Sequence, residues 1–305
     1  MDTNHSKLEQ LFVLRQKPTV AVPFPQDDAV LFTMKHALEH QWADFLLIGD
    51  RSTIEAAAEQ QGIDVSAMEI LPASHEEEAC QVAAQAVVDG RAGAAMKGAV
   101  HSGAFSKAMF SSSKGLMSPG RLGSHVGVLD LPVYHKPLYL TDCAININPT
   151  YDQKIEILRN VLELANKLGV KNPKVGLVAP VETVNPKIQS TVDAQRLKEA
   201  YHAGELKDLP QGAILDGPFG MDVALSADAA RIKGIPSQVA GDVDILLFPE
   251  LNSGNVAYKT FTFAGKGTIA GVLTGSKIPL ILTSRADSDQ TKLLALRLGI
   301  SLAGQ

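Results

Sequence analysis

The chain has 305 residues, of which 45% are apolar and 20% charged, and its formal net charge at pH 7 is −5. This length exceeds the roughly 250–300 residues that one hydrophobic core usually serves, so it predicts two α/β lobes. The acidic balance argues against nucleic-acid binding, and no apolar run approaches the ~20 residues that cross a bilayer. The two cysteines, Cys80 and Cys143, are too few for a disulfide framework, so we expect reduced thiols in a cytoplasmic protein.

Short apolar runs alternate with amphipathic segments along the whole chain. The first half predicts strands and helices in turn: strands over 19–23, 45–49, 69–72, 94–97, 126–129 and 138–141, with helices that include 27–40, 53–61 and 76–88. The second half predicts a helix over 151–168, a strand over 175–179, a helix over about 192–203, strands over 212–215, 243–248 and 278–282, and a closing helix over about 288–298. This alternation is typical of parallel sheets built from β-α-β units.

The last three predicted strands each stop at small, polar or charged residues. They stop at Asp216-Gly217, at Pro249-Glu250 and at Thr283-Ser284-Arg285. In open α/β sheets, ligands bind outside the carboxyl ends of the strands. The third ending sets a hydroxyl beside a guanidinium fork, which suits a phosphate or an acyl phosphate. The sequence therefore predicts an enzyme with an anion site at this edge.

A second candidate anion site follows the strand over 94–97. Lys97 ends the strand, Gly98 and Ser102 follow, and the next helical segment holds Lys107. Glycine allows close backbone approach, and a helix amino terminus presents free N–H groups to an anion. A plain capped helix is the simpler interpretation, but a lysine at a buried strand end needs an anionic partner. We therefore expect this loop to face a phosphate.

Two other patterns imitate known sites. His36, Glu39 and His40 match the H-x-x-E-H pattern of metallopeptidases, but the segment offers no identifiable third ligand, so we interpret it as a solvated helix face and predict no metal site. Residues 265–271 imitate a dinucleotide fingerprint that opens a helix over 268–276. That helix is short for a crossover, which favours a glycine-rich turn over nicotinamide binding.

Five blocks of the chain carry a family resemblance. They are residues 96–101, 124–126, 140–147, 181–187 and 216–292. Through these blocks the chain resembles the phosphate acetyl/butyryl transferase family, and within it the phosphate butyryltransferase branch. The resemblance implies an isocitrate/isopropylmalate dehydrogenase-like fold of two α/β lobes with parallel-rich sheets. It implies one lobe of residues 1–140 and 285–305, another of 141–284, and an active site in the interdomain cleft.

The resemblance also implies roles for individual residues. Ser284 and Arg285 match the family's catalytic serine–arginine pair, and the acetyl branch is expected to carry an aspartate as thiol base where this chain has Thr291. Asp287 and Asp289 are the carboxylates nearest to the pair in sequence, and Asp287 is our candidate base. The expected substrate-binding residues match the phosphate-side loop and the family's G-N-x-x-Y-K block: Lys97, His101, Ser102, Lys107, Asn255, Tyr258 and Lys259.

The implied reaction is reversible transfer of a short acyl group, butyryl or acetyl, between coenzyme A and inorganic phosphate. Phosphate attacks the thioester directly in a ternary complex, without a bound cofactor, a nucleic acid or a membrane, and the family is expected to form homo-oligomers. A buried Cys143 is expected to be structural rather than an acyl carrier. Two alternatives stay open: a metal- and NAD(P)-dependent hydroxyacid dehydrogenase of the same fold, and a non-catalytic binder of coenzyme A or acyl phosphate.

Overall fold

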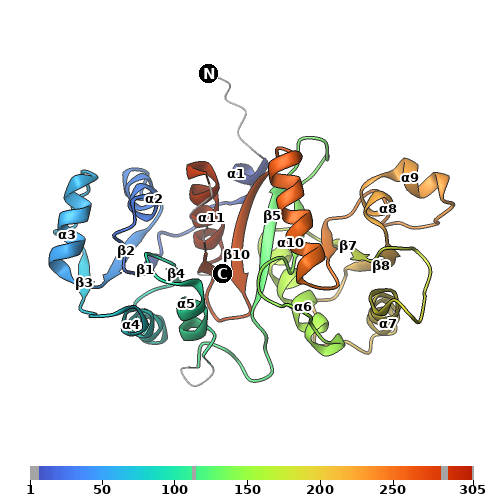
Figure 1. The fold of residues 1–305 in the computed structure, drawn as a ribbon, viewed down its shortest axis with the longest axis horizontal. Coiled ribbons are helices and arrows are strands. Elements are labelled where there is room, and N and C mark those ends of the chain that lie inside the picture. The colour runs from blue at the N-terminus through green and yellow to red at the C-terminus, as the bar shows by residue number, and fades with distance from the viewer. Residues whose placement is uncertain (1–6, 112–114, 283–287, 304–305) are drawn as a thin grey trace. The chain divides into compact units, whose positions relative to one another are not determined.

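A computed structural model describes residues 7–111, 115–282 and 288–303 (Figure 1). Its contacts divide the chain into two compact units. Unit I comprises Glu9–Gly123 and Ala270–Gln305, and unit II comprises Met1–Leu8 and Ser124–Ile269. The two lobes predicted from sequence change over at residues 140 and 284 instead. Both that division and the cleft expected between the lobes stay predictions.

Unit I is built on parallel strands with helices between them. Its strand order is β3 (Glu69–Leu71), β2 (Asp44–Ile48), β1 (Thr19–Pro23), β4 (Ala94–Met96), β11 (Leu280–Ile281) and β10 (Thr268–Thr274). The pairs from β3 to β11 are parallel, whereas β10 runs antiparallel to β11. The helices are α2 (Asp28–Glu39), α3 (Arg51–Gln60), α4 (Glu76–Val88), α5 (Ser102–Met109) and α11 (Asp289–Leu302), and α1 (Lys7–Leu11) precedes them.

Unit II has the same layered design. Its strand order is β5 (Ser124–Asp130), β6 (Leu138–Thr141), β9 (Ile245–Leu247), β7 (Lys174–Val178) and β8 (Ile214–Phe219). Only the β5–β6 pair is antiparallel among the pairs described for these strands. Its helices are α6 (Tyr151–Lys167), α7 (Gln189–His202), α8 (Met221–Leu225), α9 (Ala227–Ile232) and α10 (Leu251–Lys259), with a π-helical turn η2 (Thr260–Ala264) after α10.

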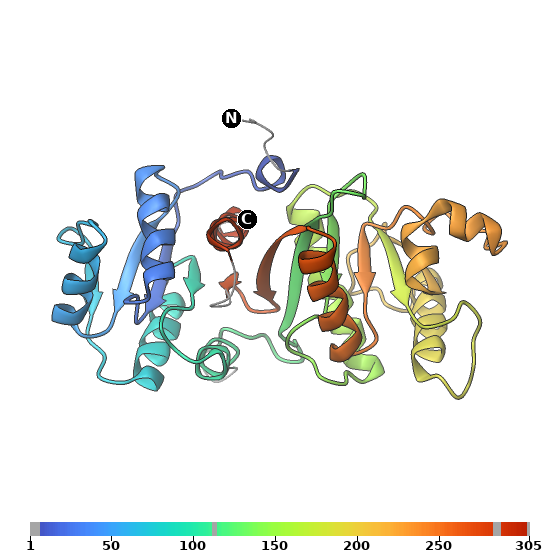
Figure 2. The same cartoon turned by 45° about the horizontal axis from the view of Figure 1, so that its top comes forward.

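Local sequence explains where these elements begin and why they are buried. The strands are apolar on both faces because helices cover both sides, so Val20, Leu47 and Met96 lie in the core of unit I. The helix α2 starts where the Asp27 side chain accepts from the N–H groups of Ala29 and Val30. At the other end of the chain, α11 packs against α2 and β4 of the same unit (Figure 2).

The structure confirms the mixed α/β class rich in parallel strands, and it corrects several details. Residues 268–274 form the strand β10, not the predicted helix over 268–276, because the five successive residues 269–273 are buried and Leu273 pairs with Leu280 of β11. The predicted strand over 212–215 does not stop at Asp216-Gly217 but continues to Phe219 as β8. The β10–β11 and β5–β6 pairs are antiparallel, and the short helices α8, α9 and α10 were not predicted.

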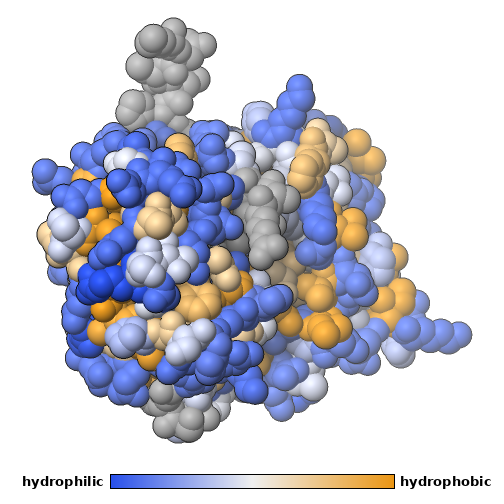
Figure 3. Space-filling view, turned by 60° about the vertical axis from the view of Figure 1, so that its left-hand side comes forward, coloured by the Kyte–Doolittle hydropathy of each residue, from blue (hydrophilic) through white to orange (hydrophobic). Residues whose placement is uncertain are grey.

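One face of the molecule has the mixed surface that is ordinary for a globular protein. Hydrophilic residues dominate the face shown in Figure 3, with apolar residues scattered between them. Among the helices of the described segments, none is long and apolar enough to cross a membrane.

Candidate functional site

The loop after β4 is held tightly against the end of β1. Gly98 lies so close to the carbonyl oxygens of Pro23 and Phe24 that a Cβ at this position would overlap them. Lys97 Nζ donates to the carbonyl oxygens of Gly98 and Val100, both at 3.1 Å. The Lys97 ammonium therefore shapes the loop itself, a role that the sequence analysis did not predict.

The same loop sets a histidine against a carboxylate. The His101 ring lies with Nδ1 2.7 Å from Glu76 Oε2, and its backbone N–H donates to Glu76 Oε1 at 2.8 Å. Partial burial raises the pKa of Glu76, but these hydrogen bonds from His101 outweigh it and lower that pKa below its usual value. The His101 side chain is 87% exposed, so its Nε2 faces solvent.

Glu76 was missed by the sequence analysis. It is the first residue of α4 and lies 25 positions before His101, so no local pattern joins the two. A neutral His101 that donates Nδ1–H to Glu76 keeps a lone pair on Nε2. That arrangement, in which a carboxylate orients an imidazole, is the one that enzymes use to move protons.

The other two predicted residues of this loop lie at opposite ends of α5. Ser102 opens the helix and is exposed, whereas Lys107 is in its last turn. The two residues are five positions apart, which separates them by about 7.5 Å along the helix axis and places them on different faces. Helix α5 therefore does not bring the two side chains together. Their binding roles stay predictions.

The predicted catalytic pair follows the strand beside this loop. β11 is parallel to β4, with Ile281 opposite Met96, and the Lys97 N–H donates to the Ile281 carbonyl oxygen at 3.0 Å. Both carboxyl ends therefore lie at one edge of the sheet of unit I. Ser284, Arg285 and Asp287 come next in the chain but lie outside the described residues, so their catalytic roles stay predictions.

Thr291, which stands where the acetyl branch is expected to carry its base, belongs to a helix cap. Ser288 caps α11 and accepts from the Thr291 N–H, and the two hydroxyl oxygens are 3.0 Å apart. A threonine hydroxyl is also far too weak an acid or base to take a thiol proton near neutral pH. Thr291 therefore cannot replace the aspartate that is expected in the acetyl branch.

In unit II, three of the resemblance blocks meet in a buried polar cluster. The turn after β6 wraps around the Asp142 carboxylate, which accepts from the N–H groups of Ala144 and Ile145 at 2.8 and 3.0 Å and from Asn146 Nδ2 at 2.6 Å. The same carboxylate accepts from the backbone N–H of His125 at the start of β5. Asp142 is thus a structural centre that fixes the turn.

Helix α10 completes this cluster with the G-N-x-x-Y-K block. Asn255 Nδ2 donates to the Cys143 carbonyl oxygen at 3.0 Å, and the Tyr258 ring meets the His125 ring edge-on at a centroid distance of 5.9 Å. Lys259 ends the helix and is exposed. Burial and the neighbouring Asp142 raise the pKa of the Cys143 thiol well above its ordinary value. That environment disfavours a thiolate nucleophile.

Unit II also contains a cavity of about 990 Å³ at the carboxyl ends of its parallel strands. Lys154 and Asp193 form an ion pair of 2.6 Å in its wall, and the Arg196 guanidinium stacks over the Tyr151 ring at 3.7 Å. The remaining lining combines hydroxyl, acidic and apolar groups, among them Ser190, Met221, Asp222, Glu250 and Ser253. Sequence analysis did not foresee this cavity, because its wall combines the ends of three strands, β7, β8 and β9, with residues of α6 and α7.

One group of side chains in the described segments has the spacing for a metal ion: His36, Glu39 and His40 on α2. Partial burial and the adjacent His40 lower the pKa of His36, so its ring is neutral near pH 7. These residues belong to unit I but to a different helix from the loop after β4.

Comparison with known proteins places this geometry in a family. The family model described as phosphate acetyl/butaryl transferase matches residues 74–298. A phosphate butyryltransferase of Clostridium acetobutylicum is 37% identical over 290 residues, which cover 95% of each chain. A branched-chain phosphotransacylase of Enterococcus faecalis V583 has a crystal structure similar to this fold, with a TM-score of 0.80 and 31% identity over 93% of this chain and 98% of that chain.

A more distant likeness concerns the fold alone. The 4-hydroxythreonine-4-phosphate dehydrogenase of Klebsiella pneumoniae has a TM-score of 0.51 and 11% identity over 94% of this chain and 100% of that chain. This agrees with the dehydrogenase-like fold that the sequence blocks imply. The extent of the family match and of the full-length relatives leads to one conclusion: the chain belongs to the phosphate acetyl/butyryl transferase family.

Proposed function

We propose that the protein is a phosphate acyltransferase that moves a short acyl group reversibly between coenzyme A and inorganic phosphate, with butyryl-type chains preferred over acetyl. The observation that carries this proposal is the near full-length similarity to a phosphate butyryltransferase. The parallel alignment of β4 and β11 supports it, because it sets the loop around His101 beside the strand that leads to Ser284-Arg285.

The proposed step is a direct displacement in a ternary complex of acyl-CoA and phosphate. A phosphate oxygen attacks the thioester carbonyl carbon, the C–O bond forms, the C–S bond breaks, and the thiolate takes one proton. Arg285 neutralises charge on the acyl phosphate, and Ser284 hydrogen-bonds the sulfur or the developing oxyanion. Ser102 and the loop after β4 receive the phosphate. The reaction needs no bound cofactor.

We assign the transfer of the thiol proton to the His101–Glu76 pair. In the reverse direction, His101 Nε2 accepts the proton of the coenzyme A thiol, whose ordinary pKa is about 8.5. Glu76 holds the imidazole through Nδ1, so Glu76→Gln should lower the turnover of acyl phosphate with coenzyme A by about 10-fold or more. The test is the pH profile of kcat/KM, which His101→Gln should change. An unchanged profile would exclude His101 as the base.

The cavity of unit II is large enough to receive part of coenzyme A, and the Arg196 guanidinium offers an anion partner for its phosphates. Arg196→Ala is therefore expected to raise KM for coenzyme A with little effect on kcat.

We also propose a cytoplasmic homo-oligomer. Two exposed apolar side chains on α10 and η2, Val256 (64%) and Phe263 (80%), support a subunit contact there.

The dehydrogenase alternative is not favoured. It would need a cluster of aspartates free to surround a divalent metal, but four aspartates between residues 216 and 244 that could serve are each engaged by a lysine. Asp216 pairs with Lys198, Asp222 with Lys233, Asp242 with Lys174, and Asp244 with Lys136.

The decisive experiment measures free thiol released from acetyl-, propionyl-, butyryl- and isobutyryl-CoA with and without phosphate. We expect phosphate-dependent release that is faster for the four-carbon chains. Binding of coenzyme A without release would favour the non-catalytic binder. Arg285→Ala should sharply reduce release while the circular dichroism spectrum stays unchanged.

A further inference from the structure

In contrast to the interpretation of this pattern from sequence alone, we propose that His36 and Glu39 of α2 and His40, which caps the helix, bind a Zn²⁺ ion at the surface of unit I. This site lies outside the transfer machinery. The proposal rests on the placement of the three side chains, and it does not depend on the enzymatic activity. The ligand class follows from the donors, because two imidazoles and a carboxylate suit borderline divalent transition ions.

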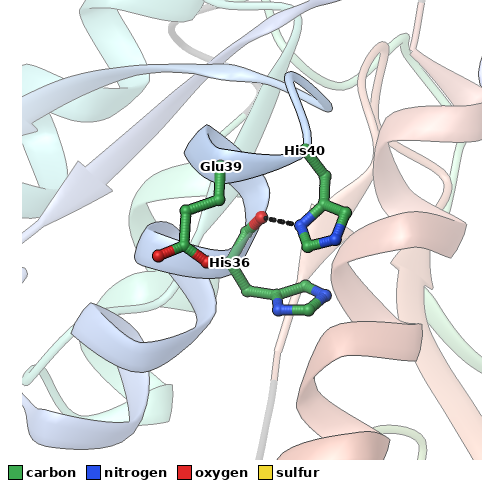
Figure 4. Close-up of side chains that lie close together, drawn as sticks. All are labelled: His36, Glu39 and His40. Atoms are coloured by element: carbon green, nitrogen blue, oxygen red, sulfur yellow. Dashed lines mark hydrogen bonds between the residues drawn. The ribbon is translucent and has the colours of Figure 1, made fainter.

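The helix brings both imidazoles to one face. His36 and His40 are four positions apart, a spacing that makes side chains neighbours along a helix, and their ring centroids are 4.1 Å apart (Figure 4). One ligand atom from each of His36, Glu39 and His40 lies within 4.8 Å of the others. Zinc–nitrogen bonds are about 2.0–2.1 Å, so binding requires the two rings to turn out of their stacked arrangement and the Glu39 carboxylate to turn toward them, with water as the fourth ligand.

The hydrogen bond of His40 fixes the tautomer that a metal ligand needs. Its Nδ1 lies 2.8 Å from the carbonyl oxygen of His36, and because a carbonyl only accepts, Nδ1 carries the proton (Figure 4). In the neutral ring the lone pair is then on Nε2. Metal-bound histidines typically donate their second ring nitrogen to a carbonyl or carboxylate in this way, which fixes the tautomer.

The surrounding residues affect the affinity of this site for a metal ion and include a fluorescent side chain that can report binding. The Trp42 ring packs against both imidazoles, at centroid distances of 5.0 Å from His36 and 5.3 Å from His40. The Arg297 guanidinium lies over the Trp42 ring, 5.1 Å from its centroid, and its positive charge disfavours binding of a divalent cation nearby. The Glu39 carboxylate offsets that charge. We therefore expect moderate affinity and a direct effect of a bound ion on Trp42, which is the chain's single tryptophan.

The test uses the full-length protein after chelator treatment. Zn²⁺ is titrated calorimetrically, and Cu²⁺ is titrated while Trp42 fluorescence is followed, because a Cu²⁺ ion at this distance quenches the indole. The expected result is one Zn²⁺ per chain, and Zn²⁺ should displace the Cu²⁺ and restore the fluorescence. His40→Ala and His36→Gln should each weaken Zn²⁺ binding by about 10-fold or more, and Glu39→Gln by less.

The control variant is His135→Asn, which removes another exposed histidine with a carboxylate partner, Asp242 at 2.8 Å. It should leave the affinity for Zn²⁺ and the quenching of Trp42 unchanged. Circular dichroism shows whether each variant is folded, and His40→Ala is the decisive one because that side chain is exposed. Wild-type protein that binds no Zn²⁺, or a folded His40→Ala variant that binds it equally well, would overturn the proposal.

Discussion

The buried ion pair between Lys154 and Asp193 provides the sharpest test of the structure of unit II. Lys154 Nζ lies 2.6 Å from Asp193 Oδ2, and the two side chains are only 10% and 12% exposed. Replacing Lys154 by Met leaves the Asp193 carboxylate buried without its cation. Breaking such a pair from one side typically costs about 3–5 kcal/mol, because an uncompensated charge stays in a poorly solvated place.

The expected loss lies at the lower end of that range. Gln189 Nε2 still donates to Asp193 Oδ1 at 2.8 Å, so the carboxylate keeps one partner. We expect Lys154→Met to lower the free energy of unfolding by about 3 kcal/mol, or Tm by roughly 6–12 °C, at about 2–4 °C per kcal/mol. The measurement is urea and thermal unfolding followed by circular dichroism, since the single tryptophan lies in unit I.

Two further variants make the reasoning falsifiable. The double variant Lys154→Met/Asp193→Leu should lose less than the sum of the single variants, because it leaves no buried charge. As a matched control, Arg231→Met removes an exposed pair with Asp228, whose side chains are 74% and 83% exposed, and should cost at most about 1 kcal/mol. If Lys154→Met proves no more costly than this control, the pair is not buried as described.

Three other changes test separate parts of the molecule. Gly254→Ala should destabilise the protein by about 1–3 kcal/mol in urea unfolding, because its Cβ would overlap the Asp142 carbonyl oxygen. Burial raises the pKa of Asp242, but hydrogen bonds from Lys174 and two neighbours outweigh burial and depress that pKa. The ionised carboxylate therefore stabilises the folded protein at pH values above its ordinary pKa of about 3.8, and this contribution is lost as the pH falls below that value. Asp242→Asn should thus lower stability at pH 7 by about 1 kcal/mol, and the difference should vanish in acid. Cys143→Ala should keep most phosphate-dependent thiol release, and a trapped acyl adduct on Cys143 would contradict direct transfer.

The elements that sequence predicts well are those with local causes. Helix α4 has the predicted bounds of Glu76 and Val88, because its apolar positions repeat at helical spacing and an acidic first turn favours its start. The strands β1 and β6 also coincide with the predicted runs. The family membership likewise follows from sequence, because short blocks keep their residue order whatever their neighbours in space.

The remaining features depend on contacts between distant parts of the chain. β10 escaped prediction because its glycine-containing run resembles a turn motif, and only pairing with another strand makes it a strand. Glu76 meets His101 through the packing of α4 beside α5. The cavity of unit II arises from the ends of strands that are adjacent in space and distant in sequence. Sequence by itself determined the class, the family and the candidate residues, since periodicity and capping act over a few residues. Which side chains share a hydrogen bond or a pocket was decided by tertiary structure, because strand order and helix packing bring together residues that no local pattern connects.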